Sequence, residues 1–429
     1  MDRDGRVTIV EGNLADDGAV RSAGAGEPSS AVGLGMLSGI RVIDFSQALS
    51  GPYCTLMLAD LGADVIKIEQ PGLGDDARHW GPPFVGEDAA YFMSVNRNKR
   101  SVVLDLKAPD HLAQVLSLIK SCDVVLENWR PGTAERLGLG AETLRALHPE
   151  LIFCSISGFG QDQGPRSGYD QIVQGTSGAM TLTGRPGEPT KWGIPVADIA
   201  AGMFAATAII SAIYERTRRG IGRTIDIAMQ DTIVSMLSHH AGRYLADGEV
   251  PGTSYNGHAT IVPYGMFQTS DGFINMCVGN DSQFQRMCSA LGRDDVGNDP
   301  RFQTNPLRLE YRSELLQEVE ATLRSITVDD ALVALDAVGV PAGAVRDVGE
   351  VPSDTATGAR NMILSFDRDD VTAARAVNTP WKFDGVAPTV RMAPPRLGEH
   401  TAAVLDEIRY ASAGVHPKTE SELGPGGQA

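Results

Sequence analysis

Short runs of β-branched and apolar residues alternate with helix-like stretches between residues 40 and 156, and this alternation strongly constrains the fold. The predicted strands are Ile40–Phe45, Val65–Ile68, Val102–Leu106, Val124–Leu126 and Leu151–Ile156, and helical stretches lie between several of them at 52–62, 109–121 and 141–148. Strands that alternate with helices predict an α/β fold with a mainly parallel sheet that is covered on both faces. Ligands of such open sheets bind at the carboxyl ends of the strands.

A different pattern follows a long apolar helix, which we predict at 199–216, and a short strand at Thr224–Ile227. Tyr264–Val278 is typical of a hairpin that turns at Asp271–Gly272. Three helices are predicted after it, at 281–292, 306–325 and 328–338, and then a strand at Val340–Val348. This part of the chain indicates a smaller α+β domain.

The two patterns divide the chain into five segments. We predict a flexible N-terminal extension at 1–36, the first part of a large domain at 37–227, a linker and small domain at 228–340, a return to the large domain at 341–411, and a flexible tail at 412–429. The two extensions are rich in small and polar residues, which favour disorder.

Charge and cysteine content exclude several classes of partner. The formal net charge of −17 makes nucleic acid and anionic membrane poor partners for the chain as a whole. Five cysteines are scattered without Cys-x-x-Cys spacing, which predicts reduced thiols rather than disulfides or a zinc ribbon. The first residues contain no apolar signal core, so we expect a cytoplasmic protein.

Standard nucleotide-binding and metal-binding motifs are missing from the sequence. The Gly33–Gly35 pair precedes the first strand instead of following it, and no Walker A sequence occurs. No set of His and Cys residues has ligand spacing, so we expect no metal site. We likewise expect no permanently bound cofactor.

Basic residues gather in two stretches despite the acidic balance. Asn96–Arg100 reads NRNKR and is followed by Lys107, while Asn128–Gly132 reads NWRPG and is followed by Arg136. Arg and Lys side chains together with loop amides suit a phosphate-bearing ligand. A solvated charged surface explains the same residues equally well.

Asp198 is the only charged residue between Trp192 and Tyr214. Burying a carboxylate among apolar residues is costly unless it is paired, hydrogen-bonded or used. Because Asp198 lies at the expected start of a helix, one interpretation is an N-cap. The other interpretation is a buried carboxylate nucleophile.

Several sequence blocks, in order, resemble the class III coenzyme A transferases, the superfamily that also contains the α-methylacyl-CoA racemases. The blocks are GIRVIDFSQALSGPYCTLMLADLGADVIKIEQPGLGD, NRNKRSVVLDLK, ENWRPGTAERLGLG, GFGQDQGPRSGYDQIVQGTSG, DIAAGM, TSDGF and PPRLGEHT. The resemblance extends over about 37–411. It implies a Rossmann-like large domain, a small domain, two linkers and a homodimer of interlocked rings.

The resemblance also implies a site and a reaction. Asp198, in the DIAAGM block, matches the catalytic aspartate, which attacks an acyl-CoA and carries CoA as an aspartyl thioester to a small carboxylic acid. The helix start is expected to keep Asp198 ionised. The implied contacts of the CoA substrate are Leu49, Ser50, Gln70, Leu104, Lys107, Asn128, Trp129, Arg130, Arg136, Tyr169 and Asp170.

Two alternatives remain beside the transferase. A 2-methylacyl-CoA racemase needs acid/base groups, and racemases carry His where this chain has Tyr169. The ordinary pKa of Tyr, near 10, makes it a poor base at neutral pH, although Asp170 is present. The second alternative is a non-catalytic paralogue that only binds CoA.

Overall fold

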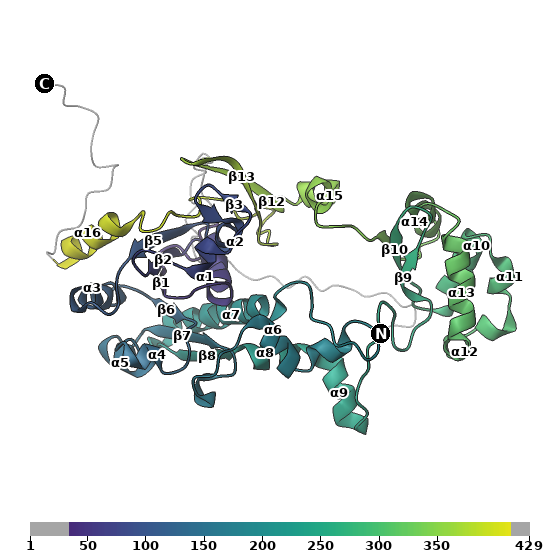
Figure 1. The fold of residues 1–429 in the computed structure, drawn as a ribbon, viewed down its shortest axis with the longest axis horizontal. Helices are drawn as coiled ribbons and strands as arrows, with labels where there is room; N and C mark the ends of the chain where they lie inside the picture. Colours follow the sequence, from purple (N-terminus) through teal and green to yellow (C-terminus); the bar gives the residue numbers. More distant parts are fainter. Residues whose placement is uncertain (1–33, 413–429) are drawn as a thin grey trace, which may run out of the picture. The chain divides into compact units, whose positions relative to one another are not determined.

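A six-stranded parallel sheet forms the centre of the large domain (Figure 1). The computed structural model describes residues 34–412, so the predicted extensions at 1–36 and 412–429 lie almost entirely outside the described residues. In spatial order the strands are β5 (Lys99–Val103), β2 (Asp64–Glu69), β1 (Arg41–Asp44), β6 (Val124–Glu127), β7 (Ile152–Ser157) and β8 (Thr224–Ala228). All five neighbouring pairs are parallel, which confirms the predicted α/β class.

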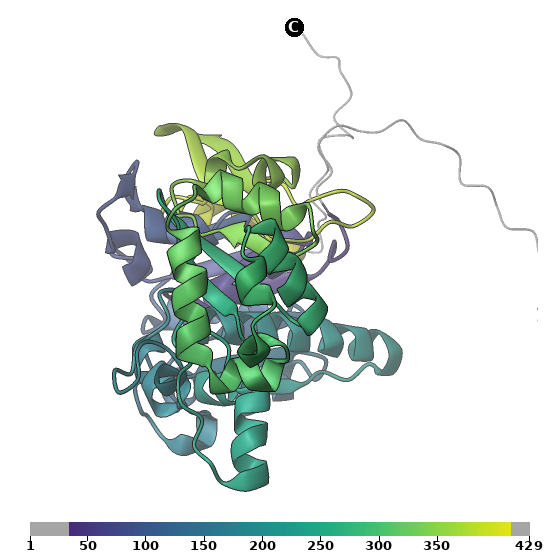
Figure 2. The same cartoon turned by 90° about the vertical axis from the view of Figure 1, so that its right-hand side faces the viewer.

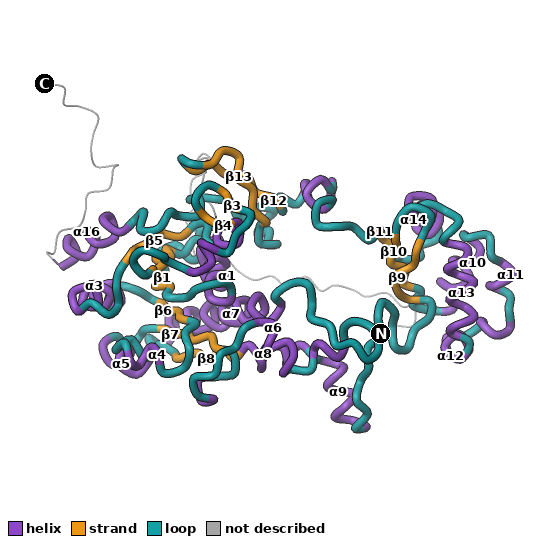
Figure 3. Tube along the Cα trace, in the orientation of Figure 1, coloured by secondary structure: helices purple, strands orange, loops and turns teal. Residues whose placement is uncertain are grey.

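Helices cover both faces of this sheet (Figure 3). Val42 and Ile43, neighbours on β1, are both fully buried but belong to different cores, because successive side chains on a strand point to opposite faces. One core contains α1 (Ser50–Asp60), α7 (Val196–Arg219) and α8 (Met229–Met236). The other contains α3 (Pro109–Ile119), α4 (Thr133–Arg136), α5 (Ala141–Leu147) and α16 (Thr401–Ser412).

Helix α7 packs on the first core through small residues. Ala201 and Ala205 are fully buried, and a Cβ atom at Gly202 would lie 2.6 Å from the carbonyl oxygen of Ser50, so α1 and α7 touch closely. This helix is long and apolar enough to cross a membrane, but 56% of its most apolar 18-residue stretch is buried inside the protein. The predicted core helix is therefore present, although Met203 and Phe204 face outward.

The strand order reverses between β1 and β6, which lie side by side. From β1 the chain proceeds outward to β2 and β5, and it then crosses over to β6 on the other side of β1. The loops that leave the carboxyl ends of these two strands diverge, which leaves a crevice at this switch point. Ligand sites of open α/β sheets form there.

The small domain has a core of its own around a three-stranded sheet, β11–β10–β9 (Figure 3). Figure 2 shows its helices, in green, facing the viewer. The predicted hairpin is confirmed as β9 (Tyr264–Gln268) and β10 (Phe273–Cys277), which β11 (Ala342–Ala344) extends. Its helices are α10 (Asp281–Ala290), α11 (Asp294–Gly297), α12 (Asn305–Glu310), α13 (Arg312–Leu323) and α14 (Val328–Asp336). The single helix predicted at 306–325 divides at Tyr311, whose φ of −103° and ψ of 36° are not helical.

The segments flanking the small domain rejoin the large one. Met229 and Ile233 of α8 belong to the first large-domain core, although 228–340 was predicted as linker and small domain. The connection continues with α9 (Ser238–Asp247). After the small domain, α15 (Thr355–Ala359) and the hairpin of β12 (Ile363–Arg368) and β13 (Val371–Val377) precede α16. Val404 of α16 is fully buried in the second core.

The basic run Asn96–Arg100 proves to be structural, so its interpretation as a phosphate site or a solvated surface is wrong. Strand β5 begins at Lys99, three residues before the predicted start, which places the run at the amino end of a strand, away from the ligand edge. Arg97 is fully buried, and its Nε donates a hydrogen bond of 3.1 Å to Asp60. The Lys99 ammonium is buried 3.5 Å from the carboxylate of Asp44.

Candidate active site

A cavity of about 450 Å³ lies at the switch point and contains Asp198. Its walls come from the loops after β1, β6 and β7, from α6 (Asp170–Thr176) and from the start of α7. Its polar and aromatic lining residues include Gln47, Ser50, Trp80, Tyr91, Asn128, Trp129, Arg130, Arg166, Tyr169, Asp170, Lys191 and Asp198. The position agrees with the ligand edge expected for this sheet topology.

Asp198 is the third residue of α7, so its interpretation as an N-cap is wrong. The helix begins at Val196, its N-cap is Pro195, and no side chain of the cap accepts a hydrogen bond. The cap is supplied from a neighbouring helix, because Asp170 Oδ1 accepts a hydrogen bond of 2.8 Å from the backbone N–H of Ala197. The Asp198 carboxylate is thereby left free for another role.

The surroundings of Asp198 raise its pKa to about 7, contrary to the expectation that the helix start keeps it ionised. Burial is the largest cause, and the negative charge of Asp170 adds to it. A hydrogen bond with Ser50 acts in the opposite direction and lowers the pKa. A carboxylate of raised pKa is a more basic nucleophile, although a smaller fraction of it is ionised at neutral pH.

Three cationic side chains line the cavity. Among the described residues no carboxylate forms an ion pair with Arg130, Arg166 or Lys191. The Arg166 guanidinium stacks on Phe159, with its central carbon 3.9 Å from the ring centroid. Stacking by the face leaves the in-plane N–H groups of an arginine available to an anion.

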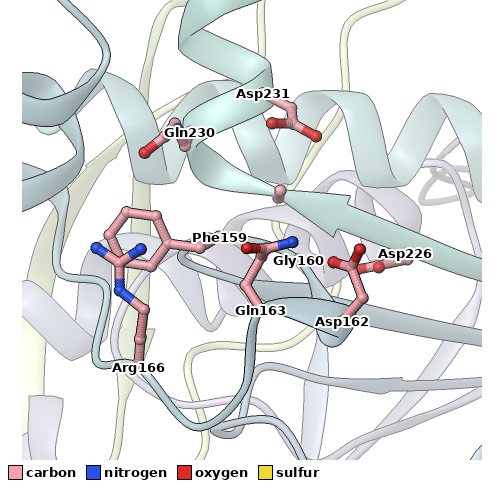
Figure 4. Close-up of a pocket in the computed structure, with 9 residues that line it drawn as sticks. Phe159, Gly160, Asp162, Gln163, Arg166, Asp226, Gln230 and Asp231 are labelled. Carbon is pink, nitrogen blue, oxygen red and sulfur yellow. The ribbon is translucent and has the colours of Figure 1, made fainter.

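Arg166 also lines a second cavity, shown in Figure 4. Three carboxylates also line this second cavity, those of Asp162, Asp226 and Asp231. The neck of the 159–167 loop is pinched at Gly158, where a Cβ atom would lie 2.5 Å from the Cα atom of Gly168. Only glycine allows the two backbones to approach so closely.

The predicted CoA contacts divide into two groups. Ser50, Asn128, Trp129, Arg130, Tyr169 and Asp170 line the cavity around Asp198. Leu49 lines a neighbouring cavity of about 280 Å³, Leu104 is buried in the second core, and Gln70, Lys107 and Arg136 are exposed. Gln70 donates to the Gly74 carbonyl and Arg136 to the Thr133 hydroxyl. All eleven contacts stay predictions.

Sequence reasoning missed several residues of the wall. Trp80 and Tyr91 form an edge-to-face pair with ring centroids 5.1 Å apart, yet neither has a sequence signal beyond being aromatic. Burial and the charges of Asp198, Asp75 and Asp170 raise the pKa of Tyr91 to about 12. Arg166 lies within the block GFGQDQGPRSGYDQIVQGTSG, and Lys191 lies five residues before the first residue of α7; neither was singled out from the sequence.

No metal centre is evident in the part of the chain from 34 to 410, where no group of three or more His, Cys, Asp or Glu side chains is arranged to hold an ion. All five cysteines are free thiols, as their scattered positions predict. Burial raises the pKa of the Cys54 and Cys154 thiols well above the ordinary value, which makes both poor nucleophiles. Asp198 remains the strongest candidate for covalent chemistry.

The chain is similar to enzymes that transfer CoA. A family model described as CoA-transferase family III matches residues 37–401. The succinate–glutarate CoA-transferase of Agrobacterium fabrum (strain C58) is 42% identical over 382 residues, 87% of this chain and 95% of that protein. The succinyl-CoA:glutarate CoA-transferase of Homo sapiens is 34% identical over 92% of this chain and 91% of its own length. The solved structure of a CAIB/BAIF family protein from Brucella suis matches with a TM-score of 0.80 at 39% identity, over 87% of this chain and 99% of that chain.

Proposed function

The chain belongs to CoA-transferase family III, and we propose that it transfers CoA from an acyl-CoA to a dicarboxylic acid through a covalent intermediate on Asp198. The observation that carries the proposal is a partly buried carboxylate of raised pKa in a cavity at the switch point of the sheet. The backbone N–H of Ala197, at the start of α7, donates its hydrogen bond to Asp170. The Asp198 carboxylate is therefore not needed to cap its own helix.

The proposed reaction has four steps that balance without an added acid or base. Ionised Asp198 attacks the acyl-CoA carbonyl, forming a mixed anhydride and expelling CoA thiolate. The thiolate attacks the aspartyl carbonyl, which gives an aspartyl-CoA thioester and releases the donor as its carboxylate. The acceptor carboxylate then attacks this thioester and forms a second anhydride, and the thiolate attacks the acceptor carbonyl, which regenerates Asp198.

A dicarboxylic acceptor fits the charges of the cavity. One carboxylate of such an acid reacts at Asp198, while the second must be neutralised inside a partly desolvated site. Arg166 and Lys191 lie on the same walls without an ion-pair partner among residues 34–412, and Arg130 is available in the same way for the phosphates of CoA. The two relatives named above act, by their names, on succinate and glutarate, which are dicarboxylates.

The racemase alternative is not favoured. The named relatives are CoA-transferases. Asp170, the remaining candidate base, accepts hydrogen bonds at both oxygens, from Ala197 at 2.8 Å and from Gln174 at 2.7 Å. A carboxylate that is used twice as an acceptor is a weak base for removing an α-proton.

The proposal also includes a cytoplasmic homodimer. The outward-facing side chains of Met203, Phe204 and Tyr214 on α7 and of Leu245 on α9 provide apolar surface that a second copy can cover. The free thiols suit a reducing compartment. Light scattering coupled to gel filtration tests the dimer, and a monomer at micromolar concentration contradicts it.

The function is tested with succinyl-CoA as donor and glutarate as acceptor, followed by mass spectrometry. Hydroxylamine added with the donor is expected to convert Asp198, and no other carboxylate, into the hydroxamate. Asp198→Ala and Asp198→Asn are expected to lose transfer while they still bind CoA. Full transfer by Asp198→Ala excludes the covalent mechanism. Tight CoA binding by the unmodified enzyme, without turnover on a panel of donors and acceptors, supports the non-catalytic paralogue instead.

A further inference from the structure

Asp75 is a buried carboxylate that does not line the candidate active-site cavity. It is 1% exposed, whereas the next residue, Asp76, is one of the lining residues. Its Oδ1 accepts two backbone hydrogen bonds of 3.0 Å, one from the N–H of Ala48 and one from the N–H of Ala77. Its Oδ2 forms an ion pair of 2.9 Å with the Lys67 ammonium. Both carboxylate oxygens are therefore engaged by groups of the protein.

The two backbone groups that Asp75 holds belong to two different parts of the cavity wall. Ala48 lies in the loop after β1, and Ala77 lies in the short helix Asp76–His79, which Asp75 caps. These two segments line the cavity through Gln47, Ala48, Asp76 and Trp80. A single carboxylate thus joins two parts of the wall that come from distant positions in the chain.

Lys67 completes this clamp from the central sheet. It lies on β2, it is fully buried, and its ammonium donates a hydrogen bond of 2.6 Å to the Ser46 carbonyl. Because the Ser46 carbonyl and the Ala48 N–H flank Gln47 in the chain, the ion pair holds the backbone on both sides of Gln47. Ala48 has a φ of +63°, which is uncommon for a residue other than glycine and which persists where the surroundings hold it.

The short helix is tied to the same strand. The backbone N–H of Asp75 donates to the Glu69 carboxylate at 3.0 Å, and Glu69 is the last residue of β2. Arg78, which is 3% exposed, donates to that carboxylate twice, at 2.8 Å and 2.7 Å. Strand β2 therefore carries the clamp at Lys67 and the anchor of the short helix at Glu69.

A contribution to stability alone does not explain the choice of these two residues. The cost of desolvating a buried ion pair offsets much of its attraction, and apolar residues of similar volume often stabilise a fold as well. An apolar pair, however, cannot accept two backbone N–H bonds and donate to a carbonyl. The distinctive property of Lys67 and Asp75 is that they hold three backbone groups at defined positions.

We propose that Asp75 and Lys67 are positioning residues, which hold the loop after β1 and the short helix Asp76–His79 in the arrangement that lets Asp198 attack a bound thioester. Both roles rest on Asp198 as the nucleophile of the proposed function. Neither residue lines the cavity, so each acts through the wall residues that it holds. A displacement of reacting groups by about 1 Å costs up to about a hundredfold in rate.

Two double variants separate the tethers from the charges. Lys67→Gln/Asp75→Asn removes both charges but keeps an acceptor for the N–H groups of Ala48 and Ala77 and a donor for the Ser46 carbonyl. Lys67→Met/Asp75→Leu also removes both charges, at similar side-chain volume, and keeps none of these tethers. With succinyl-CoA and glutarate, the first variant is expected to keep kcat within about threefold, and the second to lower it about tenfold to hundredfold.

Leu335→Ala is the control for lost stability. Leu335 is fully buried in the core of the small domain, so its truncation destabilises the protein without removing a contact of either wall segment. Its kcat is expected to stay unchanged below the unfolding transition, which thermal unfolding defines for every variant.

Hydrogen exchange followed by mass spectrometry detects the tethers independently of activity. Peptides that cover 46–49 and 75–80 are expected to exchange slowly in the unmodified protein and in Lys67→Gln/Asp75→Asn, and at least about tenfold faster in Lys67→Met/Asp75→Leu. Fast exchange of the Ala48 and Ala77 amides in the unmodified protein overturns the proposal, even if the second double variant does not fold.

The activity measurements have equally definite outcomes. Unchanged kcat in a folded Lys67→Met/Asp75→Leu overturns the positioning role, and so does an equal loss of kcat in both double variants. A loss of the same size in Leu335→Ala assigns the effect to stability and also overturns the role. If the unmodified enzyme transfers no CoA, the proposed function fails, and hydrogen exchange still decides whether Asp75 and Lys67 hold the two wall segments.

Discussion

Asp170 Oδ1 lies 2.8 Å from the backbone nitrogen of Ala197 and accepts its hydrogen bond. A carboxylate on α6 thus caps α7, one residue before Asp198. This arrangement has two consequences of opposite sign. It stabilises the start of α7, and it places a negative charge where it raises the pKa of Asp198. The pH dependence of the enzyme and part of its stability are therefore coupled through Asp170.

The pH profile of the unmodified enzyme is expected to show an acid limb near pH 7. Asp198 must be ionised to attack, and its pKa is raised to about 7, so kcat/KM is expected to increase tenfold per pH unit below 7 and to level off above it. Initial rates between pH 5 and 9 with saturating acceptor test this expectation. A profile that is flat down to pH 5 contradicts it.

Asp170→Asn is expected to move that acid limb to lower pH, because it removes the negative charge next to Asp198 while its amide oxygen still accepts from Ala197. The loss of the charged cap and of the acceptor for Gln174 is expected to cost about 1 kcal/mol of unfolding free energy. Asp162→Asn, an exposed acid of the second cavity, is the control and is expected to change neither quantity.

Asp198→Asn is expected to stabilise the fold at pH 8. The pKa of Asp198 is higher in the folded protein than in the unfolded chain, so ionisation of this carboxyl group destabilises the folded state. The destabilisation reaches its full size above pH 7, where the group is ionised in both states, and it is absent below about pH 4, where the group is protonated in both. Removing the charge is expected to add about 1–3 kcal/mol at pH 8, after allowance for partial exposure. Urea unfolding at pH 8 and pH 4 measures the difference, and an equal effect at both values contradicts it.

Arg166→Gln and Lys191→Gln test the anchor for the second carboxylate. At least one of them is expected to raise the KM for glutarate tenfold or more while leaving the KM for a monocarboxylic acceptor of the same length within about twofold. The KM for the acyl-CoA donor is the internal control. If both variants raise the KM of every donor and leave the ratio between acceptors unchanged, these cations bind CoA instead.

Arg97→Met is expected to destabilise the protein by about 3–5 kcal/mol, because it leaves the buried carboxylate of Asp60 without its cation. Arg130→Met, which removes an exposed cation of the cavity, is the matched control and is expected to leave stability within about 0.5 kcal/mol. Denaturant unfolding of both variants measures this. A folded, equally stable Arg97→Met with weakened CoA binding restores the ligand role for the NRNKR run.

Much of the fold was readable from local patterns. The alternation of strands and helices predicted the parallel sheet, because burial on both faces requires continuous apolar runs. The hairpin at Asp271–Gly272 was readable because turn geometry demands those residues. The early start of β5 at Lys99 was not readable, because Lys99 is buried through an ion pair with Asp44, a residue far away in the chain. The break of the helix at Tyr311 was not predicted either.

The sequence by itself determined the family of this protein and the identity of Asp198 as the unusual acid, since one charge in a long apolar segment is visible without any structure. Only the tertiary structure decided what each polar group does. It assigned the helix cap to Asp170, buried Arg97 and Lys99 in ion pairs, and set Asn128 across the switch point against Gln47. These roles depend on contacts between residues far apart in the chain, and such contacts also set the pKa of Asp198.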